Sequence, residues 1–208
     1  MIRLCVFDFD STLMDGETID ILAAAYGVGD EVKDITHKAM SLGIDFFESL
    51  TQRVSLLKGM PYEKVLEIGK NLPLMNGSFE LIEFLKSKNI LSVVFSGGFH
   101  EGIDPAMKKL GFDLGFANYL HQKEGKLTGL VGGEMMFSNS KGLMLQRLKK
   151  FLNLKDEEVM CVGDGANDIA MFEQSGLKIA FCAKEILKAK ADICIDTKDL
   201  KELMKVIK

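Results

Sequence analysis

The segment LCVFDFDST, residues 4–12, is a short apolar run that ends in two aspartates, a serine and a threonine. Further apolar runs follow along the chain: ILSVVF (90–95), VMCV (159–162), IAFC (179–182) and ICI (193–195). Continuous runs of this kind, without polar alternation, are typical of parallel strands that are covered on both faces. Helical stretches separate them at 79–88, 105–110, 141–152, 166–174 and 184–190. This order predicts a doubly wound α/β fold, with a mainly parallel sheet in a Rossmann-like core.

The interval between the first two predicted strands is too long for one crossover helix. Its pattern predicts helices over 18–26, 31–41, 45–58 and 62–70, with breaks at glycines and at Pro61. We therefore expect a helical cap domain of residues 15–75, inserted after the first strand into a core domain of residues 1–14 and 76–208. A later stretch, residues 116–136, alternates and contains glycines, which predicts an antiparallel hairpin.

Composition excludes several classes of protein. The 26 basic and 30 acidic side chains give a formal net charge of −4, which is not that of a nucleic-acid binder. No apolar run approaches the roughly 18 residues of a membrane span. The N-terminus, MIRLCVFDFD, is not a signal peptide, so we expect a cytoplasmic protein. The four cysteines are scattered, which favours buried free thiols over a zinc site or disulfides.

Three predicted strands end in unusual polar segments: Asp8–Thr12, Ser96-Gly97-Gly98 and Gly163–Asp168. Ligands of open parallel sheets bind outside the carboxyl ends of the strands, so these segments should converge. The carboxylates of Asp8, Asp10, Asp164 and Asp168 would then repel one another strongly without a cation. Because Mg²⁺ prefers oxygen ligands and accepts a substrate phosphate, the sequence predicts a magnesium site.

The same place offers groups for an anion. Gly97 and Gly98 would let backbone N–H groups approach it closely, and the Ser96 hydroxyl adds a donor. Lys141 opens a predicted helix, and an acidic site that handles a phosphate dianion needs such a fixed positive charge.

In their order and spacing, DFDST (8–12), SGG (96–98), Lys141 and GDGAND (163–168) resemble the four motifs of the haloacid-dehalogenase-like phosphohydrolases. Residues 8–20 are similar, more narrowly, to the phosphoserine phosphatase branch. The resemblance implies that Asp8 is a nucleophile that forms an aspartyl-phosphate, and that Asp10 is the general acid and base. It also implies a ligand set. Magnesium would be held by Asp8, the backbone carbonyl of Asp10 and Asp164, with Asp168 as an outer ligand, and the phosphoryl group by Ser96, a Gly97 amide, Lys141 and Asn167.

Substrate choice should depend on the cap. Arg53 projects onto the apolar stripe of the helix predicted over 45–58. It is either an arginine with a buried stem or a guanidinium that faces a substrate carboxylate. Glu17, in the first turn of the first cap helix, either stabilises the helix dipole or binds a substrate ammonium. The resemblance implies the second role for both residues, and Met40 and Phe46 would supply an apolar wall.

With these features, the resemblance implies a magnesium-dependent phosphatase that hydrolyses O-phospho-L-serine to L-serine and phosphate, the last step of serine biosynthesis. A phosphatase for phosphothreonine or phosphohomoserine is the alternative within the class, and a non-catalytic phosphoacceptor of the receiver type is the alternative outside it. We expect a small phosphomonoester as partner, no nucleic acid and no membrane. Monomer and homodimer both remain open.

Overall fold

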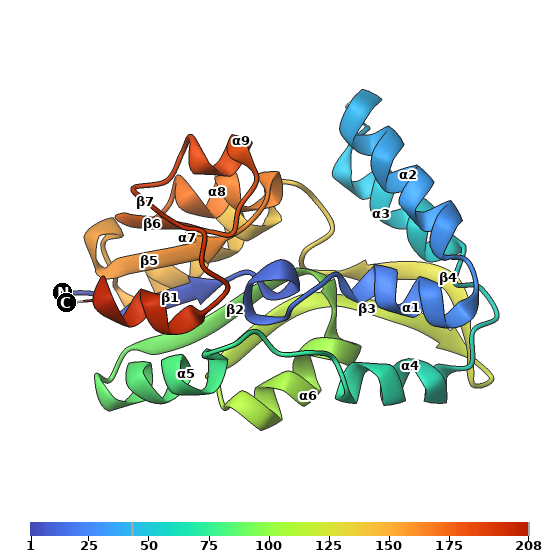
Figure 1. The fold of residues 1–208 in the computed structure, drawn as a ribbon, viewed down its shortest axis with the longest axis horizontal. Coiled ribbons are helices and arrows are strands. Elements are labelled where there is room, and N and C mark those ends of the chain that lie inside the picture. Colours follow the sequence, from blue (N-terminus) through green and yellow to red (C-terminus); the bar gives the residue numbers. More distant parts are fainter. Residues whose placement is uncertain (43, 208) are drawn as a thin grey trace.

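The computed structural model describes residues 1–42 and 44–207. Within them, seven strands form one sheet in the order β4-β3-β2-β1-β5-β6-β7 (Figure 1). Neighbouring strands are parallel except β3 and β4, which are antiparallel. The strand bounds are β1 Leu4–Phe7, β2 Leu91–Phe99, β3 Leu114–Lys123, β4 Lys126–Gly133, β5 Val159–Gly163, β6 Leu177–Phe181 and β7 Ile193–Ile195. The mainly parallel α/β sheet expected from the sequence is thus confirmed.

Both faces of the sheet are covered, as the continuous apolar strands require. Along β1, Cys5 and Phe7 belong to one buried cluster, whereas Leu4 and Val6 belong to the other. The first cluster is completed by α5 (Ser78–Ser87), α6 (His100–Leu110) and the C-terminal 3₁₀ segment Leu200–Lys205. The second is completed by α7 (Ser140–Leu152), α8 (Ile169–Phe172) and α9 (Glu185–Lys188). Successive strand residues therefore point into opposite cores.

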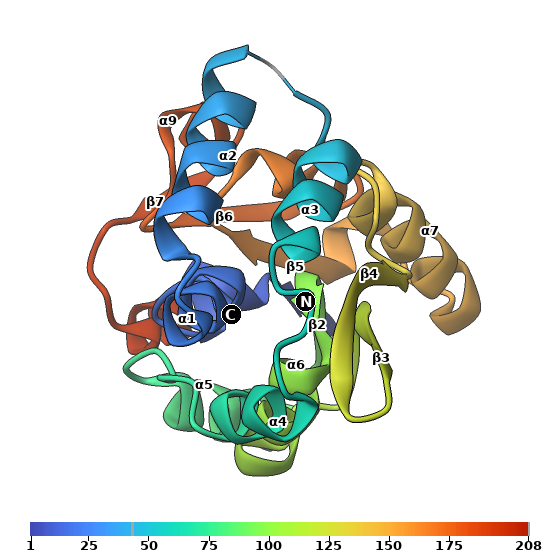
Figure 2. The ribbon, with the colours of Figure 1, turned by 90° about the vertical axis from the view of Figure 1, so that its right-hand side faces the viewer.

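The insertion after β1 consists of α1 (Thr18–Tyr26), α2 (Gly29–Leu42), α3 (Phe46–Ser55) and α4 (Tyr62–Lys70). Figure 2, which views the sheet end-on, shows α2 and α3 in front of β5 and β6, with the β3–β4 hairpin beside them. The helices of the insertion form a third apolar cluster, which also contains Phe99, Leu120, Leu127 and Met136 from β2, the hairpin and the loop that follows it. The insertion is thus packed on the β3–β4 hairpin, and its exact division from the core stays a prediction. No helix in the described ranges is long and apolar enough to cross a membrane.

The predicted hairpin is present, and its turn has the backbone of a tight β-hairpin connection. Glu124 and Gly125 both adopt positive φ angles, of 52° and 73°. A type I′ turn needs positive φ at both central positions, and its twist matches that of the strands.

Several element ends differ from the sequence-based prediction. The first strand ends at Phe7 and not at Phe9, because a helical turn begins at Phe9, with Asp8 as its N-cap. The second strand runs on to Phe99, so that the SGG segment is strand and not loop, and α6 begins at His100 and not at Pro105. The helix predicted over 166–174 is a 3₁₀ turn followed by the short α8. Glycine and proline residues are therefore weak signals for the end of a strand or helix where tertiary packing stabilises the element beyond them.

Candidate active site

The turn after β1 holds two aspartates at the carboxyl end of the sheet. Asp8 is 3% exposed, and its Oδ1 accepts a hydrogen bond from the Phe9 N–H at 2.7 Å. Its own N–H donates to the carbonyl of Val162 on β5, which ties the turn to the neighbouring strand. Ser11 has a φ of 57°, in the left-handed region, and this reverses the chain directly after Asp10. The local backbone thus aims both carboxyl groups beyond the strand ends.

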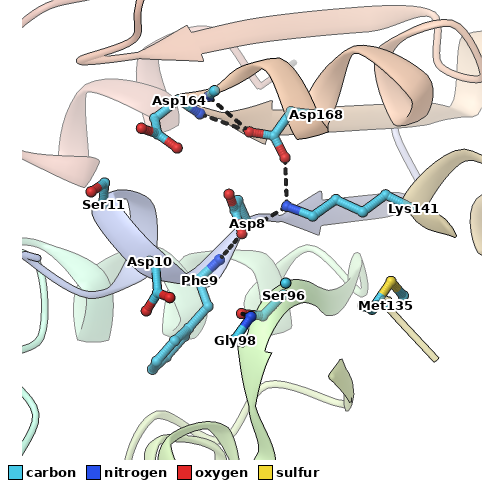
Figure 3. Close-up of polar contacts among 12 residues, drawn as sticks. Asp8, Phe9, Asp10, Ser11, Ser96, Gly98, Met135, Lys141, Asp164 and Asp168 are labelled. Atoms are coloured by element: carbon cyan, nitrogen blue, oxygen red, sulfur yellow. Dashed lines mark hydrogen bonds and ion pairs between the residues drawn. The ribbon is translucent and has the colours of Figure 1, made fainter. Parts of the chain in front are cut away.

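Asp168 ties together the loop after β5 and α7. Its Oδ2 accepts from the backbone N–H groups of Asp164 and Gly165, both at 3.0 Å. Its Oδ1 accepts from Lys141 Nζ at 2.6 Å, and the same ammonium lies 2.8 Å from Asp8 Oδ1 (Figure 3). Lys141 is 3% exposed and Asp168 is fully buried. A single buried cation therefore bridges two carboxylates that come from opposite ends of the sequence.

The negative charge at this place exceeds the positive charge. Carboxylate oxygens of Asp8, Asp164 and Asp168 all lie within 4.8 Å of one another. Burial, and then the charge of Asp168, raise the pKa of Asp8 well above its ordinary value and that of Asp164 to about 7. Burial lowers the pKa of Lys141, but Asp168 and Asp8 outweigh it and raise that pKa above its ordinary value. A buried set of oxygen donors with surplus negative charge is what a hard divalent cation binds.

Among the described residues, this metal-binding group contains three carboxylates and not the four that the sequence suggested. The side chain of Asp10 faces the start of α1, where its Oδ1 accepts from both the N–H and the hydroxyl of Thr18. Burial and the charge of Glu17 raise the pKa of Asp10 to about 7, although the Thr18 hydrogen bonds lower it. Asp10 is thus separate from the cluster and has the proton affinity of a group that works near neutral pH.

The SGG segment lies against both the turn and the cap. Ser96 is fully buried, and its Oγ accepts from the N–H of Gly98 at 2.9 Å. A Cβ on Gly98 would lie 3.0 Å from Asp10 Oδ2, and one on Gly97 would lie 2.8 Å from the Phe46 ring. Only glycine lets these neighbours approach the backbone so closely.

A cavity of about 520 Å³ opens above the carboxylates. Nine of the residues expected from the sequence line it: Asp8, Asp10, Glu17, Phe46, Arg53, Gly97, Gly98, Asp164 and Asn167. Ser96, Lys141 and Asp168 are buried and do not line it. The side chain of Met40, the remaining expected residue, lies outside the part that the structure describes.

The cap end of the cavity carries charges of both signs. Arg53 is half-buried, and its Nε donates to the carbonyl of Ser49 one turn earlier at 3.2 Å. Burial lowers the pKa of Arg53, whereas Glu17 and Asp20 raise it. Glu17 directly precedes α1 rather than lying in its first turn, and its Oε1 accepts from the Ser11 hydroxyl at 2.8 Å. The cavity therefore offers a guanidinium and a carboxylate to a ligand that itself has both charges.

Sequence reasoning missed two charged residues that line the cavity, Asp20 and Lys184. Asp20 lies three residues after Glu17, and this spacing places helical side chains on one face. Lys184 follows β6, whose carboxyl end lies at the same edge of the sheet as those of β1 and β5. The spacing of Asp20 from Glu17 and the position of Lys184 after a strand could both be read from the sequence. A single charged residue at such positions is, however, common on any protein surface.

Comparisons with known proteins agree with this geometry. A sequence model of the haloacid dehalogenase-like hydrolases matches residues 2–176. The phosphoserine phosphatase of Campylobacter jejuni subsp. doylei is 74% identical over 207 residues, which cover 100% of both chains. That of Methanocaldococcus jannaschii is 50% identical, over 99% of this chain and 98% of the relative.

Solved structures are similar over the full length. A phospho-aspartyl intermediate analogue of phosphoserine phosphatase superposes with a TM-score of 0.94 at 50% identity, covering 100% of this chain and 99% of the other. A substrate-bound phosphoserine phosphatase complex also has a TM-score of 0.94, at 49% identity and with the same coverage. The chain therefore belongs to the haloacid dehalogenase-like hydrolases and, within them, to the phosphoserine phosphatase family.

Proposed function

We propose that this protein hydrolyses O-phospho-L-serine to L-serine and phosphate in a Mg²⁺-dependent reaction that passes through an aspartyl-phosphate. The observation that carries the proposal is the set of charged side chains that line one cavity. Asp8 and Asp164 line it, with Lys141 buried behind Asp8, and so do Arg53 from the cap helix α3 and Glu17 at the start of α1. Phosphoserine has a phosphate at one end and an ammonium and a carboxylate at the other. The names of the similar proteins support the same substrate.

The group of three carboxylates fits a divalent cation, because its donors are all oxygens and because burial and neighbouring carboxylates raise the pKa values of Asp8 and Asp164. Asp8, Asp164 and the backbone carbonyl of Asp10 would hold Mg²⁺, and Asp168 would support them from outside the ligand set. When bound, the ion supplies positive charge to a phosphoryl oxygen.

In the first step, a carboxylate oxygen of Asp8 attacks the phosphorus. A bond forms between that oxygen and phosphorus, and the bond from phosphorus to the serine oxygen breaks. Asp10 gives its proton to the departing oxygen, so that serine leaves as a neutral alcohol. Lys141, the Ser96 hydroxyl and the Gly97 amide stabilise the charge on the phosphoryl oxygens, which is the main task of a protein in phosphoryl transfer.

In the second step, the Asp10 carboxylate removes a proton from a water molecule that attacks the same phosphorus. The bond between phosphorus and Asp8 breaks, phosphate leaves, and the Asp8 carboxylate and the protonated Asp10 are restored. A pKa of about 7 suits both halves of this cycle, since Asp10 must release and regain one proton near neutral pH.

The cap supplies the selection of the substrate. Arg53 binds the α-carboxylate, Glu17 binds the ammonium, and Phe46 contributes to the apolar wall. Asn167 contacts the phosphate or the amino acid. Residues 15–75 thus act as the cap over a core of 1–14 and 76–208. We also propose a cytoplasmic location, in keeping with a step of amino-acid biosynthesis, and a monomer or a homodimer.

The test is phosphate release from a panel of esters, with and without Mg²⁺. Phosphoserine is expected to be the best substrate by kcat/KM, ahead of phosphothreonine, phosphohomoserine and phosphoethanolamine. A different best substrate would leave the phosphatase class standing and change the substrate. A stable phosphorylated Asp8 without turnover would identify a receiver-type phosphoacceptor and refute the enzyme.

A further inference from the structure

The start of α1 is hydrogen-bonded to the turn that carries Asp10. Thr18, the first residue of α1, is 3% exposed. Its hydroxyl lies 2.5 Å from Asp10 Oδ1, and its backbone N–H donates to the same oxygen at 3.2 Å. Two donors from one residue thus converge on one of the two carboxyl oxygens.

The other carboxyl oxygen of Asp10 has a different environment. A Cβ on Gly98 would lie 3.0 Å from Oδ2, so this oxygen is directed toward the SGG segment. Asp10 and Gly98 both line the cavity in which the substrate is proposed to bind. Within the described ranges, every hydrogen bond that the Asp10 carboxyl group receives goes to Oδ1.

A general acid must hold its proton on the oxygen that faces the leaving group. The hydroxyl oxygen of a protonated carboxyl group donates, and the carbonyl oxygen is the better acceptor. A backbone N–H can only donate, so a proton on Oδ1 would conflict with the hydrogen bond from the Thr18 N–H. The Thr18 hydroxyl could accept such a proton, but only with the proton on Oδ2 do both groups of Thr18 donate to Oδ1. The two bonds from Thr18 therefore favour Oδ1 as the carbonyl oxygen.

We propose that Thr18 is a positioning residue for the reaction: it keeps the transferable proton of Asp10 on Oδ2, on the cavity side. This inference rests on the proposed function, in which Asp10 protonates the serine oxygen. It also gives the cap a part in the chemistry, because the first residue of the first cap helix orients the acid of the core domain.

A purely structural role would consist of anchoring α1 to the turn. A second hydrogen bond, from Ser11 Oγ to Glu17 Oε1 at 2.8 Å, already joins the same two segments. Loss of an anchor would slow all substrates alike, because it would disturb the whole site. Loss of proton placement would slow only those substrates whose leaving group needs the proton.

The experiment compares Thr18→Val with Thr18→Ser on two esters. Phosphoserine releases serine, whose oxygen would leave as an alkoxide and requires protonation, whereas p-nitrophenyl phosphate releases a stabilised phenolate that does not. The readout is the first-turnover release of serine or of p-nitrophenol by rapid quench, because hydrolysis of the aspartyl-phosphate is then excluded from the rate. Asp10→Asn serves as the reference for complete loss of the acid.

Since a positioned general acid contributes about 10²–10⁴-fold, Thr18→Val is expected to slow serine release by about 10- to 100-fold. Release of p-nitrophenol should stay within about threefold of wild type, and Thr18→Ser, which keeps the hydroxyl, should restore serine release to within about threefold. Equal slowing of both esters, or no slowing of serine release, would overturn the proposal. If Thr18→Val fails to fold, Thr18→Ala against Thr18→Ser gives the same comparison, since the pair differs only by the hydroxyl.

The proposed function is tested separately by the wild-type protein. If wild type hydrolyses another alkyl phosphate but not phosphoserine, the substrate assignment fails, and the Thr18 comparison is made on that ester. If wild type hydrolyses p-nitrophenyl phosphate and no alkyl ester, the role of Asp10 as an acid fails, and the role of Thr18 fails with it.

Discussion

Replacing Arg53 by alanine tests whether the cap recognises the carboxylate of the substrate. The Nε atom of Arg53 is held by the carbonyl of Ser49, and the side chain lines the cavity. In the described ranges, the Nε contact is the one hydrogen bond found for this guanidinium. Its two terminal nitrogens are therefore available to a carboxylate, whose geometry they match in pairs.

The size of the effect follows from the partly buried position of Arg53. Two unit charges 4 Å apart attract by about 4 kcal/mol at the effective dielectric constant of a protein surface. Much of this is offset by lost hydration, and a hydrogen bond to a charged group nets about 1.5–3 kcal/mol. At 1.4 kcal/mol per decade, Arg53→Ala should lower kcat/KM for phosphoserine by about 10- to 150-fold. Because Arg53 is only half-buried, we expect the lower half of that range.

The assay measures kcat/KM on three esters. Phosphoethanolamine lacks the carboxylate, and Arg53→Ala should change its value only a few-fold. In 3-phosphoglycerate a hydroxyl replaces the ammonium, and Glu17→Gln should affect this ester less than it affects phosphoserine. Arg147→Ala, at an exposed arginine of α7 that does not line the cavity, is the matched control and should leave all three values unchanged. An equal loss on phosphoserine and phosphoethanolamine would refute carboxylate recognition by Arg53.

Four other perturbations test the nucleophile, the metal, the raised pKa of Asp164 and the packing of the cap. Asp8→Asn should abolish phosphate release while far-UV circular dichroism stays unchanged, and activity within tenfold of wild type would exclude Asp8 as nucleophile. EDTA should abolish activity, and Mg²⁺ should restore it whereas Ca²⁺, which takes more ligands at longer distances, should not. In the metal-free protein the pKa of Asp164 is raised to about 7 from an ordinary value of about 3.9. Protonated Asp164 therefore stabilises the folded state fully below about pH 4, and this stabilisation is lost as the pH rises through 7. Added Mg²⁺ should therefore raise Tm more at pH 8 than at pH 5, and an equal rise at both would contradict the shift. Gly69→Ala would bring a Cβ against the carbonyl oxygen of Glu101 where α4 packs on α6, and at an overpacking cost of about 1–3 kcal/mol it should lower Tm by about 2–12 °C in differential scanning calorimetry.

The order of strands and helices could be predicted from the sequence because it depends on local patterns. The strands at 4–7 and 193–195, and the helices α1 and α4, lie within a few residues of their predicted ends or match them. Continuous apolar runs can be stable only in a sheet covered on both faces, so the fold class followed from them. The predicted end of the second strand, before the SGG segment, and the predicted start of the next helix, at Pro105, were wrong. At both places the element continues through residues that usually end one.

The candidate site could be predicted in its membership but not in its internal contacts. Asp8 and Asp164 were expected to meet because parallel strands bring their carboxyl ends to one edge, and Lys141 was expected there because an acidic site that binds a phosphate needs a fixed positive charge. Their positions along the chain could not predict two contacts. Lys141 lies between Asp8 and Asp168, and the side chain of Asp10 is directed toward Thr18.

The sequence by itself determined which chemical groups gather at one end of the sheet, because the direction of parallel strands places the aspartates and the glycines there and the order of the motifs adds Lys141. Only the tertiary structure decided which oxygen each of these groups presents and which side of the cap faces the cavity. Asp20 and Lys184 could be assigned to the cavity only from the packing of the elements that carry them. The physical reason is that a hydrogen bond depends on a few tenths of an ångström and on the angle of its donor, and these are set by packing between segments far apart in the chain.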